Sequence, residues 1–240
     1  MRVLILAGGL GTRLRPAIGS TPKAMAPVAG HPFLEYLLGQ AARSGFRRVA
    51  LLTGSGAEVI ERYFGNGTQY GLKIAYSREP EPLGTGGALR LAASRFPDER
   101  FLVMNGDSLF DIPLDRLVDT HDRTSARATL ALARATERGR FGGVEVDALG
   151  RVGRFVEKGE PAADGLVNAG IYVVERPVLE GIEPGRAVSL EREVFPALVG
   201  AGLYAVPFEG TLVDIGLPPD LAALQAQPDA LIAAGGGLRG

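Results

Sequence analysis

Cysteine is absent from the chain, which excludes disulfide bonds and thiolate-metal sites. The apolar segment at its start, residues 3–7, is too short for a signal sequence or a membrane-spanning helix. No long run of lysine or arginine occurs and the formal net charge is −1, which argues against a nucleic-acid partner. We therefore expect a cytoplasmic protein that binds neither membrane nor nucleic acid, and whose anionic ligands are small polyphosphates.

Length and composition predict one globular domain. With 240 residues, of which 46% are hydrophobic and 22% charged, the chain can bury a complete core, and α/β folds often reach this size undivided. The glycine-rich end at residues 233–240 has no such apolar content. We predict a single domain over residues 1–232 followed by a flexible tail.

The first half of the chain alternates helix and strand patterns. Apolar spacing predicts a helix at 33–42, a strand at 48–53, a helix at 58–64, a strand at 73–76, a helix at 85–94 and a strand at 101–104. This alternation predicts an α/β fold with a doubly wound, mostly parallel sheet, Rossmann-like in plan. Beyond residue 107 the pattern changes to shorter strands, at 128–133, 143–146 and 170–174, with helix restricted to 189–198 and 220–224.

A glycine-rich loop follows the first apolar strand. Glycines at three of four positions leave backbone N–H groups free to face an anion, and two cations follow; the residues are Gly8, Gly9, Gly11, Thr12, Arg13 and Lys23. The alternative is a tight strand-to-helix turn with two solvated cations. Leu14 stands where a dinucleotide-binding loop needs its third glycine, and Gly11-Thr12-Arg13 lacks the lysine of a P-loop.

The run from Gly9 to Lys23 resembles the signature of the sugar-phosphate nucleotidyltransferases, Gly-x-Gly-Thr-Arg-Leu followed by Pro-Lys. Ile18 departs from the threonine that many members have, which leaves the subfamily open. The resemblance implies the nucleotide-diphospho-sugar transferase type of fold with an embedded sugar-binding lobe. Residues 1–107 would then mainly bind nucleotide and residues 108–224 mainly sugar phosphate.

Two acids are candidate metal ligands. Asp107 follows the strand at 101–104 and Asp214 lies between apolar residues, and each could instead cap a turn or helix. Phosphoryl chemistry between two polyanions needs a cation, and carboxylates are the ligands that Mg²⁺ prefers. The resemblance implies that Asp107 and Asp214 together hold one Mg²⁺.

The resemblance also implies which residues meet the substrates. Glu157 and Lys158 match a Glu-Lys pair that contacts sugar and its phosphate, although a solvated surface strand could carry the same charges. Asn168, Gly170, Gly142 and Gly143 match sugar-contacting segments, although turns before strands are the alternative. The nucleotide would be bound by Leu6, Ala7, Gly8, Gly9, Gly11, Thr12, Arg13, Lys23, Glu81, Pro82, Gly84, Thr85 and Gly106.

The segment at 81–88 is the expected base pocket. In pyrimidine-using relatives, a glutamine that precedes this segment commonly contacts the base. Residues 78–81 contain no glutamine. A purine is therefore favoured, and guanine in particular, because its N1–H and N2–H₂ groups suit a carboxylate or carbonyl acceptor. GTP and a sugar 1-phosphate are the expected partners.

Several segments look closest to the D-glycero-α-D-manno-heptose 1-phosphate guanylyltransferases, including 81–87, 105–112 and 213–216. Mannose 1-phosphate guanylyltransferases and N-acetylmuramate 1-phosphate uridylyltransferases share much of this scaffold and stay open as alternatives. A regulatory paralogue that binds a nucleotide sugar without catalysis is the alternative of another class. The chain could also associate as a homodimer.

The expected reaction is a single in-line displacement with three catalytic cations, Arg13, Lys23 and Lys158, and no protein nucleophile. His31 and His121 stand in no matching motif, so we interpret both as surface or structural residues.

Overall fold

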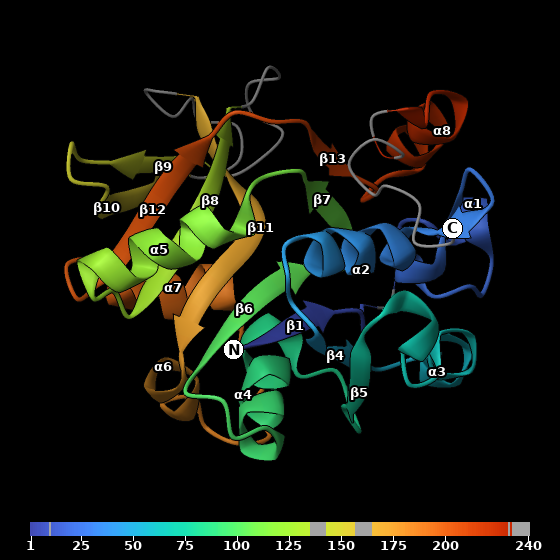
Figure 1. Ribbon diagram of the computed structural model, residues 1–240, viewed down its shortest axis with the longest axis horizontal. Helices are drawn as coiled ribbons and strands as arrows, with labels where there is room; N and C mark the ends of the chain where they lie inside the picture. Colours follow the sequence, from blue (N-terminus) through green and yellow to red (C-terminus); the bar gives the residue numbers. More distant parts are fainter. Residues whose placement is uncertain (10, 135–142, 157–164, 230, 232–240) are drawn as a thin grey trace.

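A nine-stranded sheet forms the centre of the molecule within the part of the chain that the computed structural model describes, residues 1–9, 11–134, 143–156, 165–229 and 231 (Figure 1). The strand order is β10-β9-β11-β6-β1-β4-β5, with β8 beside β11 and β12 beside β8. These strands are β1 (Arg2–Leu6), β4 (Arg48–Thr53), β5 (Lys73–Arg78), β6 (Arg100–Asn105), β8 (Ala128–Arg134), β9 (Gly143–Val146), β10 (Val152–Val156), β11 (Leu166–Glu175) and β12 (Leu203–Phe208).

Four strands from the first half make the parallel part of the sheet. β5, β4, β1 and β6 run parallel in that order. Their central positions are apolar on both faces, as expected of strands covered by helices on each side. The predicted α/β, doubly wound fold is confirmed.

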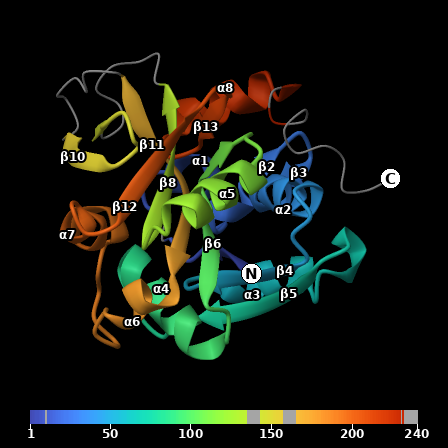
Figure 2. The same cartoon turned by 60° about the vertical axis from the view of Figure 1, so that its left-hand side comes forward.

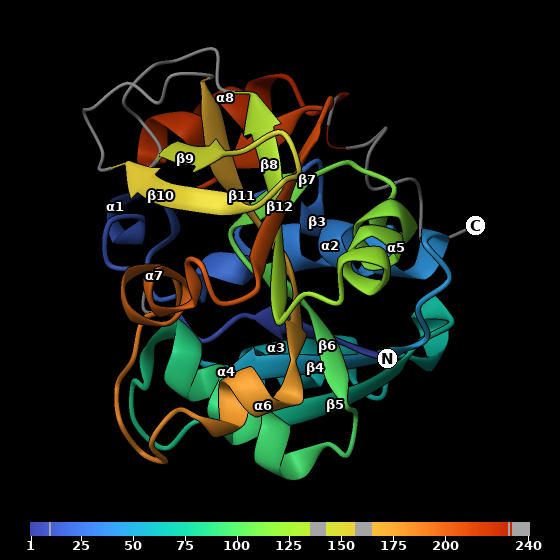
Figure 3. The same cartoon turned by 90° about the vertical axis from the view of Figure 1, so that its left-hand side faces the viewer.

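Helices cover both faces of the sheet, in agreement with the doubly wound prediction. Residues of α2, α3, α5 and α8 pack with Val3 and Ile5 of β1 into one core, and residues of α4, α6 and α7 pack with Leu4 into the other. Figure 3 shows α4 and α6 side by side below the sheet. The helices are α1 (Arg15–Ile18), α2 (Phe33–Arg43), α3 (Ala57–Phe64), α4 (Gly84–Arg95), α5 (Leu114–Thr124), α6 (Arg176–Glu180), α7 (Phe195–Leu198) and α8 (Pro218–Ala226), with 3₁₀ turns η1 (Lys23–Met25) and η2 (Thr68–Tyr70) and a π-helical turn η3 (Leu190–Val194).

The second half extends the sheet with antiparallel strands. β11 runs antiparallel to β6, β8 and β9, and β9 to β10, while β12 lies parallel to β8. Figure 2 shows this extension at the end of the sheet away from β5. β11 spans residues 166–175, where the sequence predicted only 170–174, so this strand joins the parallel half to the lobe.

The prediction that helix in the second half is restricted to 189–198 and 220–224 is wrong. α5 is a full helix that packs on β8, β11 and β12, and α6 follows β11. The apolar stripe of α5 is narrow, since Leu114 and Leu117 are buried while most other positions are charged or polar. The helix expected at 189–198 is divided into η3 and α7.

Two small sheets lie outside the main one. β2 (Pro27–Val28) pairs with β3 (His31–Pro32), and β7 (Ser108–Phe110) pairs antiparallel with β13 (Leu212–Asp214). The second pair joins segments about a hundred residues apart in sequence and positions both candidate metal ligands. Among the helices described, none has the length and apolar character needed to cross a membrane.

Candidate nucleotide and metal site

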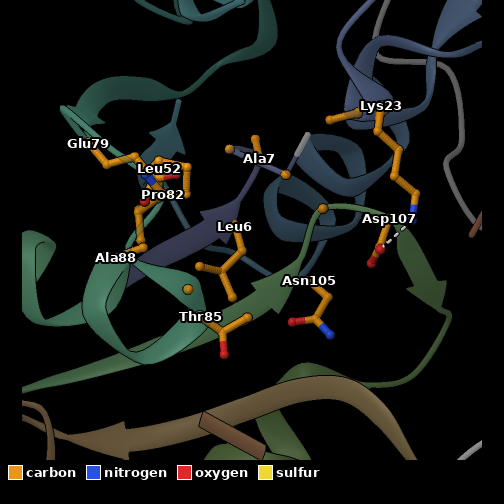
Figure 4. Close-up of a pocket in the computed structure, with 15 residues that line it drawn as sticks. Leu6, Ala7, Lys23, Leu52, Glu79, Pro82, Thr85, Ala88, Asn105 and Asp107 are labelled. Carbon is orange, nitrogen blue, oxygen red and sulfur yellow. Dashed lines mark hydrogen bonds and ion pairs between the residues drawn. The ribbon is translucent and has the colours of Figure 1, made fainter. Parts of the chain in front are cut away.

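A cavity of about 260 Å³ opens where the parallel strands end (Figure 4). Open α/β sheets bind their ligands at the carboxyl ends of the strands, and the pocket lies beyond the ends of β1, β4, β5 and β6 and against the start of α4. Its lining consists of Leu6, Ala7, Gly8, Gly9, Lys23, Ala24, Leu52, Glu79, Pro82, Gly84, Thr85, Ala88, Asn105, Gly106 and Asp107.

The lining includes most residues that the sequence assigned to the nucleotide. The strand-to-loop residues 6–9, Lys23 and Gly106 stand together with Pro82, Gly84 and Thr85 from the expected base loop. Gly11, Thr12, Arg13 and Glu81 lie outside this lining, and the last three are exposed.

Two glycines of the site are required by close approach. A Cβ on Gly106 would meet the carbonyl oxygen of Leu6, which accepts a hydrogen bond from Gly106 N at 3.1 Å. Gly11 has φ +56°, and a Cβ there would stand 3.0 Å from Lys23 Cβ. The contact explains how the two parts of the signature, twelve residues apart in sequence, act as one unit.

A second, more polar hollow shares Gly9 with the pocket. It is lined by Gly9, Arg15, Gly19, Ser20, Thr21, Pro22 and Ser55. Arg15 was not among the candidate residues, because in the sequence it stood beside Arg13 with nothing to distinguish it. The hollow offers hydroxyls and a guanidinium next to the phosphate-loop backbone.

The two candidate metal ligands are neighbours. Asp214 pairs with Ser108 across β7 and β13, and Ile215 N donates a hydrogen bond to the Asp107 carbonyl at 3.0 Å. Burial and then the charge of Asp107 raise the pKa of Asp214. Two carboxylates in this position suit a divalent cation, which would offset the repulsion between them.

Lys23 already partners one of these acids. Its Nζ lies 2.6 Å from Asp107 Oδ2, and Figure 4 shows this ion pair at one side of the pocket. Gly216 N donates to Asp214 Oδ1 at 2.7 Å, which turns that carboxylate toward its own backbone. Within the described ranges, no group of three or more His, Cys, Asp or Glu side chains forms a richer metal site. Phosphate oxygens and water would have to supply the remaining ligands.

Glu79 is a charged pocket residue that the sequence prediction missed. It follows β5, and its Oε2 accepts a hydrogen bond from Leu83 N at 3.1 Å. A Cβ on Gly8 or on Gly54 would stand 2.7 Å from Glu79 Oε1, so these two glycines make room for the carboxylate. Burial raises the pKa of Glu79. The alternation of buried and exposed residues along β5 does not indicate whether Glu79 or Glu81 faces the pocket. Both acids follow the strand, and the path of the loop decides which one points inward.

The predicted sugar segment lies in a bulge of β11. The register against β8 shifts between Asn168 and Tyr172, and Gly170 has φ +77°. Asn168 Oδ1 accepts from Gly170 N at 3.0 Å, and Asn168 Nδ2 donates to Tyr172 Oη at 2.9 Å. Gly143 pairs with Val167 at the start of β9. Gly142, Glu157 and Lys158 lie outside the described residues.

Neither histidine lies in the pocket. His121 is buried, and its two ring nitrogens lie 2.9 Å from Thr129 Oγ1 and 3.0 Å from Glu175 Oε1. His31 belongs to β3, and its Nδ1 lies 3.2 Å from Oε1 of Glu35, a buried residue in the first turn of α2. Both contacts are structural.

A doubly wound sheet with a glycine-lined pocket at the ends of its parallel strands, and two acids beside it, defines a nucleotide-binding α/β protein. The chain belongs to the nucleotidyl transferase family, whose model matches residues 2–229. The resemblance inferred from the signature is thereby confirmed.

Two relatives illustrate the family. The chain is 42% identical over 240 residues to a mannose-1-phosphate guanylyltransferase of Mycobacterium tuberculosis, covering 99% of this chain and 67% of that protein. It is 36% identical over 228 residues to a D-glycero-alpha-D-manno-heptose 1-phosphate guanylyltransferase of Aneurinibacillus thermoaerophilus, covering 95% and 98%.

The fold also matches a solved structure. HddC from Yersinia pseudotuberculosis superposes with a TM-score of 0.84 at 28% identity, over 94% of this chain and 98% of that one. The same protein has been crystallised in complex with GMP-PN.

Proposed function

We propose that the protein transfers a guanylyl group from GTP to a sugar 1-phosphate, with release of pyrophosphate. The observation that carries the proposal is that charged side chains lie at two opposite ends of one pocket. Glu79 stands at one end and the Lys23–Asp107 ion pair at the other, as Figure 4 shows. A nucleotide whose base offers hydrogen-bond donors and whose tail is anionic complements both ends.

Glu79 is the residue that we assign to the base. A carboxylate accepts hydrogen bonds, and guanine presents N1–H and N2–H₂ along one edge. Adenine places an acceptor nitrogen at N1, and that nitrogen would face the carboxylate without a proton between them. The half-buried position strengthens such a charge-assisted pair.

Asp107 and Asp214 are the residues that would hold Mg²⁺. When bound, the ion would neutralise the phosphates of GTP and the charge that develops on the leaving pyrophosphate. Burial, and then the charge of Asp107, raise the pKa of Asp214, and a divalent cation bound between the two acids would offset both effects.

The reaction is a displacement at phosphorus. An oxygen of the sugar phosphate forms a bond to the α-phosphorus of GTP, and the bond from that phosphorus to the bridging oxygen of pyrophosphate breaks. Lys23 would stabilise the α-phosphate, while Gly9, Gly11 and Arg13 receive pyrophosphate. Lys158 is assigned to the sugar phosphate through the family resemblance. No protein nucleophile or histidine base takes part.

The sugar is proposed as D-glycero-α-D-manno-heptose 1-phosphate. The heptose-specific relative supports this choice because it matches this chain along almost its whole length. Mannose 1-phosphate is the second candidate, supported by the 42% identity to the mycobacterial protein.

We further propose a cytoplasmic location, a homodimer, and the division into a nucleotide part at 1–107 and a sugar part at 108–224.

The test is Mg²⁺-dependent pyrophosphate release from five nucleoside triphosphates, each combined with heptose, mannose, glucose and N-acetylmuramate 1-phosphates. Turnover with GTP and the heptose or mannose substrate supports the proposal. Preference for UTP or dTTP contradicts the role of Glu79, and silence throughout favours a non-catalytic binding protein.

A matched pair of variants tests the base contact itself. Glu79→Gln should lower kcat/KM for GTP by about 10- to 100-fold, because a charge-assisted hydrogen bond is lost. Glu81→Gln changes a nearby exposed acid outside the pocket and should leave kcat/KM within twofold. Equal effects of the two variants would contradict the assignment.

A further inference from the structure

Glu191 lies in the turn η3, and its carboxylate contacts two elements that border the candidate substrate sites. Its Oε2 accepts hydrogen bonds from Thr85 Oγ1 at 2.9 Å and from Ser189 Oγ at 3.1 Å. Its Oε1 accepts from Tyr172 Oη at 3.4 Å. The sequence predicts Glu191 only as part of a helix, and none of the assignments above uses it. One half-buried carboxylate therefore joins the start of α4 to the centre of β11.

The hydroxyl of Thr85 is occupied by this contact, although the residue lines the pocket. It donates its single proton to Glu191, and it accepts a hydrogen bond from Leu190 N at 2.7 Å. Figure 4 shows the hydroxyl turned away from Ala7 and Glu79. Thr85 therefore offers no hydroxyl proton to a ligand in the pocket, and its side chain instead attaches the first turn of α4 to η3.

Backbone hydrogen bonds hold the same two segments together. Val188 N donates to Leu83 O at 2.9 Å, and Gly86 N donates to Val188 O at 2.8 Å. A Cβ on Gly84, whose φ is +68°, would stand 2.6 Å from Val188 O, so glycine is required at this approach. The expected base loop is thus packed directly against the segment that leads into η3.

Tyr172 carries the contact to the predicted sugar segment. Its side chain is fully buried, and burial and then the charge of Glu191 raise the pKa of its hydroxyl well above the usual range. The hydroxyl donates its proton to Glu191, so its oxygen can only accept from other groups. It accepts from Asn168 Nδ2 at 2.9 Å, and Asn168 Oδ1 accepts from Gly170 N at 3.0 Å. The proton of Tyr172 thus determines which edge of the Asn168 amide faces it.

We propose that Glu191 is a positioning residue for both substrates: through Thr85 it holds the loop beside the nucleotide, and through Tyr172 it orients the amide of Asn168 beside the sugar 1-phosphate. The inference rests on the proposed function. A planar carboxylate suits this role because both of its oxygens are engaged, so a rotation that breaks the bond on one side also weakens the bond on the other. Glu191 lies outside the pocket lining, and we assign it no contact with substrate.

The first test is steady-state kinetics of Glu191→Met, which keeps the length of the side chain and removes both acceptors. KM for GTP and KM for the sugar 1-phosphate should each rise about 3- to 10-fold, the range expected for the loss of one or two hydrogen bonds on each side. The kcat at saturating substrates should stay within about threefold. A merely structural role would lower the active fraction, and with it kcat, at unchanged KM values, and that result would overturn the inference.

Glu193→Met is the matched control. Glu193 lies in the same turn, is exposed, and accepts from Ser189 N at 2.9 Å and from Arg186 Nη2 at 3.0 Å. It therefore stabilises η3 without contacting α4 or β11 through its carboxylate, and both KM values should stay within twofold of wild type. An equal rise of KM in the two methionine variants would assign the effect to η3 as a whole and would overturn the inference.

Two further variants each remove one side of the arrangement. Tyr172→Phe should raise KM for the sugar 1-phosphate about threefold and leave KM for GTP within twofold, and Thr85→Val should do the reverse. Thr85→Ser keeps the hydroxyl and should restore the wild-type KM for GTP. These variants test the inference even if Glu191→Met does not fold, because equal or reversed effects on the two KM values would contradict it.

A double variant tests whether the contacts act through one group. Adding Tyr172→Phe to Glu191→Met should raise KM for the sugar 1-phosphate no further, because both substitutions break the same hydrogen bond. Effects that multiply would give the two residues independent roles and overturn the inference alone. Absence of wild-type turnover with all substrates would instead overturn the proposed function, and this inference with it.

Discussion

Lys23 Nζ lies 2.6 Å from Asp107 Oδ2, so the signature lysine and an acid 84 residues further along the chain form one ion pair. The lysine is 12% exposed and the acid 38%. The ammonium group of Lys23 therefore pairs with a carboxylate that we assign to the metal. Lys23 and the metal ion would compete for the negative charge of Asp107.

Lys23→Ala should bind Mn²⁺ more tightly than the wild type in the absence of nucleotide. Removing the lysine leaves the charges of Asp107 and Asp214 uncompensated, which should raise affinity roughly 3- to 10-fold. Turnover should nevertheless fall about 100-fold or more, since the α-phosphate loses its cation. Electron paramagnetic resonance of free Mn²⁺ measures the first effect and pyrophosphate release the second.

The control for this prediction is Lys73→Ala, which removes an exposed lysine at the start of β5. Its Mn²⁺ affinity and turnover should match the wild type. Weaker Mn²⁺ binding by Lys23→Ala would contradict the competition, and unchanged binding by Asp107→Asn would contradict the metal site.

Glu79→Gln should stabilise the free protein near neutral pH. Burial raises the pKa of Glu79 above its usual 4.5, so the folded state disfavours the ionised carboxylate. The stability linked to this group is present below pH 4.5 and is lost as the pH rises through the raised pKa. The variant's advantage in thermal melts should therefore be present at pH 7 and disappear as the pH falls toward 4.5. An advantage that grows on acidification would contradict the sign.

Gly106→Ala should destabilise the fold and disturb the site together. Its Cβ would meet the backbone oxygen of Leu6, which cannot move without shifting β1, and overpacking of this kind costs about 1–3 kcal/mol. Gly9→Ala is the control, since a Cβ there meets nothing within 4 Å and should change stability by less than about 0.5 kcal/mol. Chemical denaturation gives both values, and equal values would contradict the close approach.

His121→Ala should lower stability without lowering turnover. The change leaves the fully buried Thr129 hydroxyl without its imidazole partner and opens a cavity, with an expected loss of about 2 kcal/mol. Because His121 lies outside the pocket, kcat at 25 °C should stay within twofold. A large loss of kcat in a folded variant would show that the imidazole matters to the reaction.

The sequence predicted the parallel half well because its strands are continuous apolar runs and its helices have broad apolar faces. The signature loop and its lysine could be recognised because glycine and lysine at fixed spacing have few other uses. The acids could be paired only through the family resemblance, and the pairing of β7 with β13 now gives the physical reason.

The second half was harder to predict because its elements depend on tertiary packing. α5 is mostly charged and carries only a narrow apolar stripe, so its pattern resembles that of a polar loop. Glu79 and Asn105 were missed for a related reason. Each is the last polar residue of a buried strand or the first after it, and such residues commonly belong to turns. Only the convergence of four strand ends shows that both face one cavity.

β7 and β13 meet through three residue pairs, Phe110 with Leu212, Leu109 with Val213 and Ser108 with Asp214. During synthesis at the ribosome, Asp107 emerges long before Asp214, while the strands that end at the pocket come entirely from the first half. A nascent chain can thus form the pocket at the strand ends and still lack the second carboxylate. The two candidate metal ligands come together only when β13, the last strand among the described residues, pairs with β7.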